Sequence, residues 1–327
     1  AGHGRYGLTD RSISATLKLA AGDLQRALAP LGVADVKGEA VVEVRGNGTV
    51  SSPRVSCTVR GSDVRYKEVA VGALGLEAEL DTGGVVRVPG LSITNRGSAL
   101  HVRGQAGVLD GGAIRSSGEM TIDAEVDIES AKIEHFVERC SGEVSMSAHV
   151  KGNPLRPEGA VDVQLNRLDL GVQKAWRVRL AARSDGETVT VEPLRIELAP
   201  GEYSKVSGQV GYDKSMDLAA VVEGIRLGSI DPLKLGGGTE GRLSADLWAS
   251  GTMDNPQVSG EVVASDLVMQ GQPLEDWRVR VQLRDSLVEA AGRVGFDLSA
   301  SYHLASRDFS ADLHFDGTNL VPYLAIA

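Results

Sequence analysis

The chain has 327 residues, of which 42% are apolar and 24% charged, and its formal net charge is −10. This composition predicts a folded chain, and the absence of a basic block argues against nucleic acid as a partner. Forty glycines and an aromatic content of 4% predict many tight turns and an aliphatic interior.

No run in the chain approaches the ~18 apolar residues of a membrane-spanning helix. The sequence opens with Ala instead of Met and ends with VPYLAIA. We therefore expect a fragment of a longer protein, with any anchor or targeting signal outside it.

Residues 1–37 are interpreted as the end of a repeat that began earlier. They contain a helix-like segment, GDLQRALAPLGV, at 22–33. From Gly38 the chain continues as an extended stretch, GEAVVEVRGNGTVSSPRVSCTVRGSDV, with a second glycine at Gly48 and a proline at Pro53. These turn residues between β-branched runs predict a hairpin of two long strands.

The same stretch recurs twice, which indicates an internal repeat. The copies are GEVSMSAHVKGNPLRPEGAVDVQLNRLDL from Gly142 and GRLSADLWASGTMDNPQVSGEVVASDL from Gly241. A shorter element, WRVRL, begins at Trp176 and recurs as WRVRV at Trp277. The period is about a hundred residues, so we divide the chain into repeats at 38–141, 142–240 and 241–327, the last incomplete.

Each repeat is preceded by a helix-like segment of about ten residues. The second and third copies follow SAKIEHFVERC at 130–140 and GSIDPLKLGG at 228–237. The final ten residues, TNLVPYLAIA at 318–327, resemble the start of a fourth. We expect these short helices to lie at one rim, because they are too few to cover a sheet.

Apolar and polar residues alternate through almost every predicted strand. In WRVRVQLR, Trp277 and Val279 point one way while Arg278 and Arg280 point the other. Such alternation predicts antiparallel strands with one apolar face, and the fold class is all-β. Turn signals every 8–12 residues fit hairpins, and a repeat of about eight strands would extend roughly 38 Å.

Three covers for the apolar face remain open: a second sheet forming a sandwich, closure into a barrel, or an elongated, taco-like groove that holds a ligand. The candidate groove-lining set comprises apolar residues on one face of the predicted strands. It consists of Val42, Val44, Leu80, Val126, Ile128, Val178, Leu180, Val189, Val191, Ile196, Leu198, Leu243, Leu247, Val279, Val281, Leu283, Leu298, Leu313 and Phe315.

Catalytic, metal and cofactor motifs are not found. The six histidines are dispersed without HExxH, and no GxSxG or phosphate-binding loop occurs. Cys57 and Cys140 show no metal-type spacing, although one disulfide between them remains open. Trp176 and Trp277 are expected as rim or core residues, with stacking at a groove mouth as the functional alternative. We therefore expect a protein that is not an enzyme and has no catalytic, cofactor-binding or metal residues.

The repeat resembles the AsmA-like superfamily, most closely the TamB proteins. The resemblance lies in the element Gly251, Thr252, Pro256 and Gly260, the Ser-Asp-Leu at 265–267, and the short segment before each unit. The first copy departs from this pattern, with Cys57 where the third has Gly260. The resemblance covers essentially the whole chain as about three repeats.

This resemblance implies a β-sheet groove that crosses the periplasm, in a protein anchored in the inner membrane outside this segment. It implies that phospholipid acyl chains move along the groove toward the outer membrane, and that a TamA-like outer-membrane barrel is a partner. Two alternatives stay open: a scaffold for outer-membrane protein assembly that accepts a client strand at a sheet edge, and a closed array acting as a spacer or adhesin.

Overall fold

The computed structural model describes residues 2–6, 12–28, 35–49, 52–67, 69–111, 113–137, 139–230, 239–269 and 271–316. The chain divides into two compact units. The N-terminal unit holds residues 1–165 and 184–186, and the C-terminal unit holds 166–183 and 187–327. Both units are built of antiparallel β-strands, so the predicted all-β class is confirmed. The predicted helix start at 318–327 lies outside the described residues.

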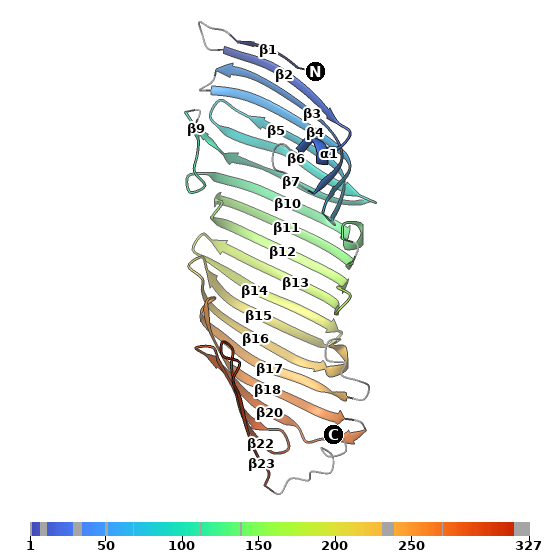
Figure 1. Ribbon diagram of the computed structural model, residues 1–327, viewed down its shortest axis with the longest axis vertical. Helices are drawn as coiled ribbons and strands as arrows, with labels where there is room; N and C mark the ends of the chain where they lie inside the picture. Colours follow the sequence, from blue (N-terminus) through green and yellow to red (C-terminus); the bar gives the residue numbers. More distant parts are fainter. Residues whose placement is uncertain are drawn as a thin grey trace. The chain divides into compact units, whose positions relative to one another are not determined.

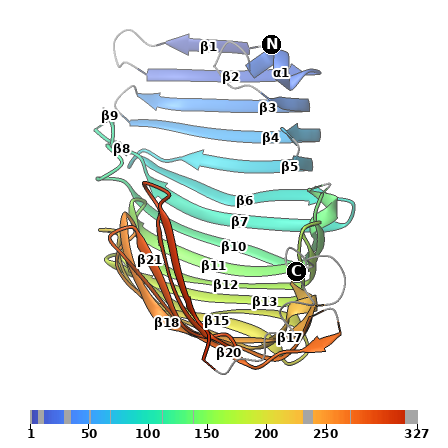
Figure 2. The ribbon, with the colours of Figure 1, turned by 60° about the horizontal axis from the view of Figure 1, so that its bottom comes forward.

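The N-terminal unit is a meander in which successive strands pair with each other (Figure 1). Its elements are β1 (Gly2–Tyr6), β2 (Ser12–Ala21), α1 (Leu24–Leu28), β3 (Val36–Thr49), β4 (Ser52–Tyr66), β5 (Val69–Leu80), β6 (Val85–Asn95), β7 (Ser98–Gly107), β8 (Leu109–Asp110), β9 (Ala113–Ile114), β10 (Thr121–Lys132), η2 (Ile133–His135) and β11 (Ser141–Asn153). The order is interrupted once, because β8 and β9 form their own small hairpin and β7 pairs with β10. Figure 2 shows α1 beside the first strands of this unit.

Two strands have residues in both units: β12 (Arg156–Asp169) and β13 (Lys174–Asp185). The remaining strands of the C-terminal unit again pair in chain order, with one exception. The short β19 pairs with β18, and β18 also pairs with β20. They are β14 (Thr188–Ala199), β15 (Glu202–Gly211), β16 (Ser215–Arg226), η3 (Leu227–Ser229), β17 (Thr239–Thr252), β18 (Asn255–Met269), β19 (Gln272–Pro273), β20 (Trp277–Arg284), β21 (Leu287–Arg293), β22 (Asp297–His303) and β23 (Phe309–His314).

The repeated hairpin has the same backbone in its three copies. Gly48, Gly152 and Gly251 adopt φ values of 108°, 88° and 91°, which only glycine adopts at little cost. In the third copy the loop is confined to Met253 and Asp254, because Asn255 and Pro256 already belong to β18. The proline is therefore a strand residue opposite Gly251, and the expected turn is shorter than its sequence indicates.

A second backbone signature follows each hairpin. Asp63, Arg167 and Asp266 all adopt left-handed φ values, of 51°, 50° and 53°. They occur at matching places in β4, β12 and β18. Beside Asp63 and Asp266 the strand register shifts, between Gly61 and Val64 in one case and between Glu240 and Arg242 in the other. The repeat is thus a feature of backbone conformation as well as of sequence.

The number of strands per repeat differs from the prediction of about eight. From β3 to β10 the main sheet has six strands, and β17 to β23, without β19, gives six again. The strands are 10 to 15 residues long from β3 to β7, well beyond the usual 5–6. A six-strand repeat extends about 29 Å across the strands at ~4.8 Å per strand.

The predicted helices are single turns. In α1 five residues are helical, and in η2 and η3 only three. The segment SAKIEHFVERC was expected to be helical throughout, but Ala131 and Lys132 are strand residues paired with Val144 and Glu143 of β11. Pairing with β11 satisfies their backbone groups in the sheet and leaves room for one turn only. Residues 29–33 and 231–237 of the other two segments lie outside the described residues.

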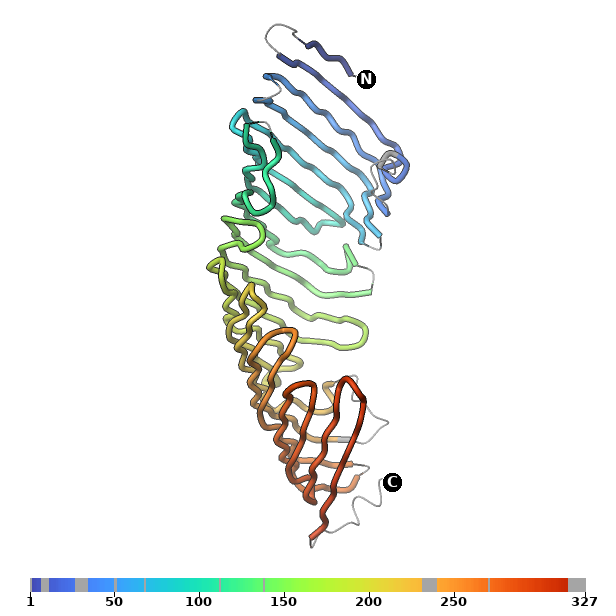
Figure 3. Tube along the Cα trace, turned by 60° about the vertical axis from the view of Figure 1, so that its left-hand side comes forward, coloured from blue at the N-terminus to red at the C-terminus, as the bar shows by residue number. Residues whose placement is uncertain are grey.

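Within each unit the strands form an open layer. Figure 3 shows the turns of successive hairpins, which alternate between the two ends of the strands. In the described part of either unit, the sheet is neither closed nor strongly curled, and no second sheet packs on it. The described residues therefore form neither a barrel nor a closed sandwich. Of the groove expected from the sequence, they bear out the open antiparallel sheet but not a strong curl.

Candidate functional site

One face of the N-terminal unit is apolar across eight strands. Strand register is the reason, because residues directly opposite each other in antiparallel strands share a face. One complete row runs from β2 to β11 through Leu19, Val42, Val59, Leu76, Leu91, Val102, Val126 and Ala148. A parallel row contains Val55, Leu80, Val86, Ala106 and Ile122. We call this surface the N-terminal apolar face.

The C-terminal unit has an equivalent surface, the C-terminal apolar face. Its central row is Leu194, Val206, Ala220, Leu247, Gly260, Val281, Ala290, Ala300 and Ala311. On one side lies the row Val191, Gly208, Leu218, Ala249, Val258, Leu283, Val288, Tyr302 and Phe309. On the other lies Ile196, Ser204, Val222, Ala245, Val262, Val279, Gly292, Leu298 and Leu313, in which Ser204 is the one polar member.

The opposite faces are polar and carry cross-strand ion pairs. In the N-terminal unit Lys18 pairs with Glu43 at 2.5 Å, and His149 lies 2.8 Å from Asp123. Arg103 donates to Glu125 at 2.6 Å, and that carboxylate raises the pKa of the guanidinium. Such exposed pairs add little stability, but their charges are hydrated, so this face is turned toward solvent.

Most members of the predicted groove-lining set fall on these two apolar faces. In the N-terminal unit they are Val42, Val44, Leu80, Val126 and Ile128. In the C-terminal unit they are Val189, Val191, Ile196, Leu243, Leu247, Val279, Val281, Leu283, Leu298 and Leu313. The register brings each subset together on one surface.

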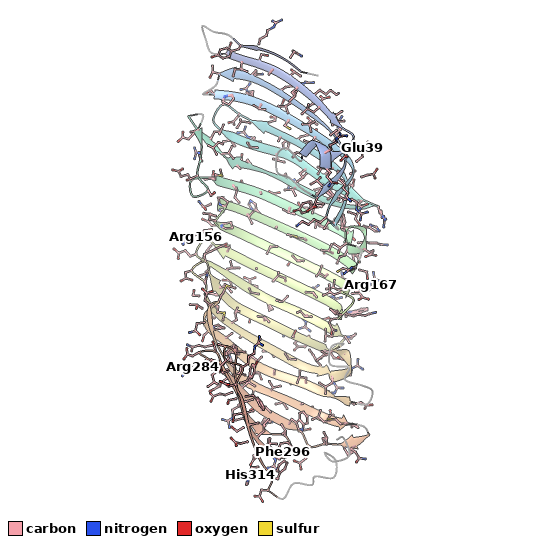
Figure 4. The ribbon with its side chains drawn as sticks, in the orientation of Figure 1. Glu39, Arg156, Arg167, Arg284, Phe296 and His314 are labelled. Atoms are coloured by element: carbon pink, nitrogen blue, oxygen red, sulfur yellow. The ribbon has the colours of Figure 1, made fainter. Side chains whose placement is uncertain are left out.

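The other four predicted residues are not placed by strand register. Val178 and Leu180 are half-buried residues of β13. Leu198 lies at a register shift between Glu197 and Ala199. Phe315 follows the end of β23, and its ring centroid lies 4.7 Å from that of Phe296, near the C-terminal strands in Figure 4.

The apolar faces are only partly shielded from water. Leu17 and Leu19 of β2 are 42% and 51% exposed, and no side chain in the described residues is both large and fully buried. The chain exposes 20257 Å² in total. A globular monomer of 34.3 kDa would expose about 13,000 Å². Each face therefore presents a continuous aliphatic surface that another apolar body can cover.

The two tryptophans at the shared repeat position differ in environment. Trp176 is 48% exposed, whereas Trp277 is half-buried opposite Ala264 at the end of the C-terminal apolar face. The indole N–H of Trp277 is buried and has no hydrogen-bond partner among the described residues. Trp277 lies at the rim of the face, as expected from the sequence.

A buried serine that the sequence did not reveal supports η2 in the N-terminal unit. Ser98, 3% exposed, accepts a hydrogen bond from the backbone N–H of Lys132 at 2.9 Å, and its Oγ lies 2.9 Å from Nδ1 of His135. Asn95 donates to the carbonyl of Ala70 at 2.9 Å and also to that of His135. These contacts tie the single helical turn to the sheet.

A buried glutamate does the same for η3 in the C-terminal unit. Glu202, 5% exposed, accepts hydrogen bonds from the Arg226 backbone at 3.2 Å, from the Arg226 guanidinium and from the Ser229 hydroxyl at 2.7 Å. Burial raises the pKa of Glu202, but the hydrogen bonds from Ser229 and Arg226 outweigh it, and the pKa lies below its ordinary value of 4.5. The carboxylate is therefore held in its ionised form.

Neither support is arranged for catalysis. Both polar groups are used by backbone and side-chain hydrogen bonds that fix a strand end.

Among the described residues no cluster of His, Cys, Asp or Glu could hold a metal ion. Cys57 and Cys140 carry free thiols, so the disulfide left open by the sequence is not formed. No helix in the described ranges is long and apolar enough to cross a membrane.

Comparisons with protein-family models, with curated proteins and with solved structures found no match to this chain. The candidate site therefore consists of the N-terminal and C-terminal apolar faces described above.

Proposed function

We propose that the protein binds phospholipid acyl chains on its apolar faces and serves as a segment of a periplasmic bridge that conducts lipid between the inner and outer membranes. The observation that carries the proposal is the continuity of the apolar rows, such as the one from Leu19 to Ala148, on an uncovered surface. The resemblance to AsmA-like proteins supports the same cargo and location, with an inner-membrane anchor outside this chain.

The physical basis is the free energy of hydrating a hydrocarbon chain. Each methylene kept out of water contributes about 0.8 kcal/mol, so a two-chain lipid with roughly thirty methylenes would face a barrier of order 20 kcal/mol in open water. A row of aliphatic side chains lowers that barrier along its whole length. Under this proposal the two walls of the sheet fold toward each other as a groove, and head groups remain in water at its edge.

No residue acts as a catalyst in this mechanism. The apolar side chains present similar surfaces from strand to strand, so an acyl chain gains no deep minimum at which it would be trapped. Movement is passive, and the direction is set by whatever supplies and removes lipid at the two ends.

The first test is lipid capture with a matched pair of variants in β7. Val102→Asp places a carboxylate at the centre of the apolar row, while His101→Asp places it on the polar face one residue away. Mass spectrometry of gently extracted protein should find phospholipid on the wild type and on His101→Asp, with at least a tenfold loss on Val102→Asp. Val279→Asp and Leu283→Arg should act likewise in the C-terminal unit.

Equal lipid content in Val102→Asp and His101→Asp, or no amphiphile on the wild type, would overturn the proposal. Far-ultraviolet circular dichroism checks that the strand content of both variants is unchanged.

The second test uses Cys57, which lies on the N-terminal apolar face between Val44 and Ala78. With Cys140→Ser in place, a photoactivatable maleimide on Cys57 should capture lipid in vivo. Capture of polypeptide instead of lipid at this position would contradict the proposal. The scaffold for outer-membrane protein assembly with a TamA-like barrel, which accepts a client strand at a sheet edge, predicts polypeptide capture by a probe on an edge strand.

A further inference from the structure

Trp248 is an exposed aromatic residue on the mainly polar face of the C-terminal unit. Its neighbour Leu247 belongs to the apolar row, so the indole of Trp248 projects from the opposite side of β17. It is 55% exposed, one of three tryptophans in the chain. The residues directly opposite are small, Ala219 on β16 and Ser259 on β18, so both flanks of the ring are open.

Polar side chains surround this ring without bonding to each other. Five of the six neighbours on the same face, two residues away along or across the strands, are polar: Asp217, Asp246, Ser250, Gln257 and Glu261; the sixth is Val221. Glu261 lies 3.7 Å from Arg278, and the other four have no side-chain partner among the described residues. Carboxylates and an amide of this kind offer both acceptors and donors to a ligand above the ring.

The same row leads from Trp248 into a hollow. Ser259 pairs with Gln282, which pairs with Glu289, which in turn faces Ser301. Around Gln282 the surface is hollowed by about 430 Å³, with a floor of small residues. The hollow is lined by Arg280, Gln282, Glu289, Ala290, Ala291, Ser299, Ala300, Ser301, Ser310 and Asp312.

The polar side chains that line the hollow also have no partner among the described residues. From Trp248 to Ser301 the row crosses four strand spacings, about 19 Å. We call this surface, from Trp248 to Ser301, the Trp248 track.

We propose that the Trp248 track binds an oligosaccharide. The C–H face of a pyranose ring is apolar while its edge carries hydroxyls, and an exposed indole ringed by Asp, Gln and Ser matches both properties. The length of the track suits several linked sugars, with one ring stacked on Trp248 and the following hydroxyls bonded to Gln282 and the serines of the hollow.

Other ligand classes fit this surface less well. An acyl chain would leave the carboxylates of Asp217 and Asp246 desolvated without a partner, which costs free energy. A nucleic acid would meet those carboxylates and Glu289 with its phosphates, and only Arg280 offers a cation in the hollow. Apart from Ala290 and Ala300, which belong to the central apolar row and also line the hollow, the residues of the track lie on the face opposite to the proposed lipid surface, so the two proposals rest on different side chains.

The test is calorimetric titration of the whole chain with chito-, cello- and malto-oligosaccharides. We expect at least one of them to bind. Trp248→Ala should lose at least tenfold in affinity, Trp248→Phe should lose less because a ring remains, and Gln282→Ala should lose severalfold. Trp176→Ala, which removes an indole of similar exposure, should bind as the wild type does.

Trp248 is exposed and its removal should not unfold the chain, which circular dichroism and thermal melting verify. Absence of binding to all three oligosaccharides, or unchanged affinity in Trp248→Ala, would overturn the proposal. Sedimentation of the free proteins separates a rival role: if Trp248→Ala dissociates a dimer of this chain, the indole is a subunit contact and the carbohydrate site is refuted.

Discussion

The supports of η2 and η3 are two solutions to one structural problem. In both units the last strand before the helical turn presents a backbone N–H that the sheet does not use, at Lys132 in one and Arg226 in the other. The N-terminal unit satisfies it with the neutral hydroxyl of Ser98, and the C-terminal unit with the ionised carboxylate of Glu202.

The difference shows that the repeat requires an acceptor at this position and not a particular residue. Ser98 and Glu202 are each the first residue of the strand that follows a tight turn, β7 and β15 respectively. A carboxylate binds its donors more strongly than a hydroxyl because the hydrogen bonds are charge-assisted. The C-terminal support should therefore be the stronger one at neutral pH and the only one of the two in which the accepting group itself responds to acid.

The largest effect is expected from Glu202→Ala. The substitution leaves the Arg226 backbone N–H and the Ser229 hydroxyl without their acceptor, and should cost about 2–3 kcal/mol in the free energy of unfolding. Urea denaturation followed by circular dichroism measures it. Asp297→Ala, at an exposed position of β22, is the control and should change little. Equal effects of the two substitutions would refute the role of Glu202.

A smaller effect is expected from Ser98→Ala. It removes the acceptor of the Lys132 N–H and the contact to His135, at a cost of about 1–2 kcal/mol. Hydrogen exchange at the Lys132 amide should accelerate, while exchange in the C-terminal unit should not. The control is Ser147→Ala on the exposed side of β11. A loss as large as that of Glu202→Ala would remove the distinction between the two supports.

The pH dependence should separate the two supports. Because the pKa of Glu202 is lower in the folded state than its ordinary value of 4.5, its stabilisation is present above that pH and is lost as the pH falls through the folded pKa. The difference in unfolding free energy between wild type and Glu202→Gln should therefore shrink as the pH falls below about 4.5. The same difference for Ser98→Ala should stay constant over this range, and a parallel decline would contradict the comparison.

The smallest effect is expected from glycine at Asp63, a position where the two units are alike. Asp63 and Asp266 both hold left-handed backbone, so replacing Asp63 with glycine should raise stability by at most about 1 kcal/mol. Asp63→Val and Asp266→Val, in contrast, should each lower it by about 1–2 kcal/mol. Thermal denaturation measures both. Different costs for the two valine variants would mean that the units do not share this backbone requirement.

Local patterns in the sequence predicted much of the architecture. Alternation such as that of Val279 and Arg280 identified antiparallel strands with one apolar side, and the recurring glycines at Gly48, Gly152 and Gly251 predicted hairpins whose backbone the structure confirms. Both signals are local, since a strand alternates by its own geometry and a positive φ constrains a single residue.

The strand count and the helices were harder to predict. Nothing local distinguishes six long strands from eight shorter ones, because the length of a strand such as β4 is set by its partners. The pattern of SAKIEHFVERC favours a helix, but pairing of Ala131 and Lys132 with β11 shortens it to one turn.

The supports at Ser98 and Glu202 were missed because a serine and a glutamate in equivalent positions share no sequence identity. The one available signal was their equal distance from the first glycine of each repeat, Gly38 and Gly142. That distance identifies a position, but the need for an acceptor there arises from a backbone group on another strand.

The amino-acid sequence by itself determined the repeat, the turns and the side of each strand that is apolar, since these depend on neighbouring residues. Only the tertiary structure decided which apolar residues meet in one row, that the two faces remain open, and that Trp248 is exposed on the polar side. Those features depend on the register between strands and on shifts such as the one beside Asp266, and register is a relation between residues distant in the chain.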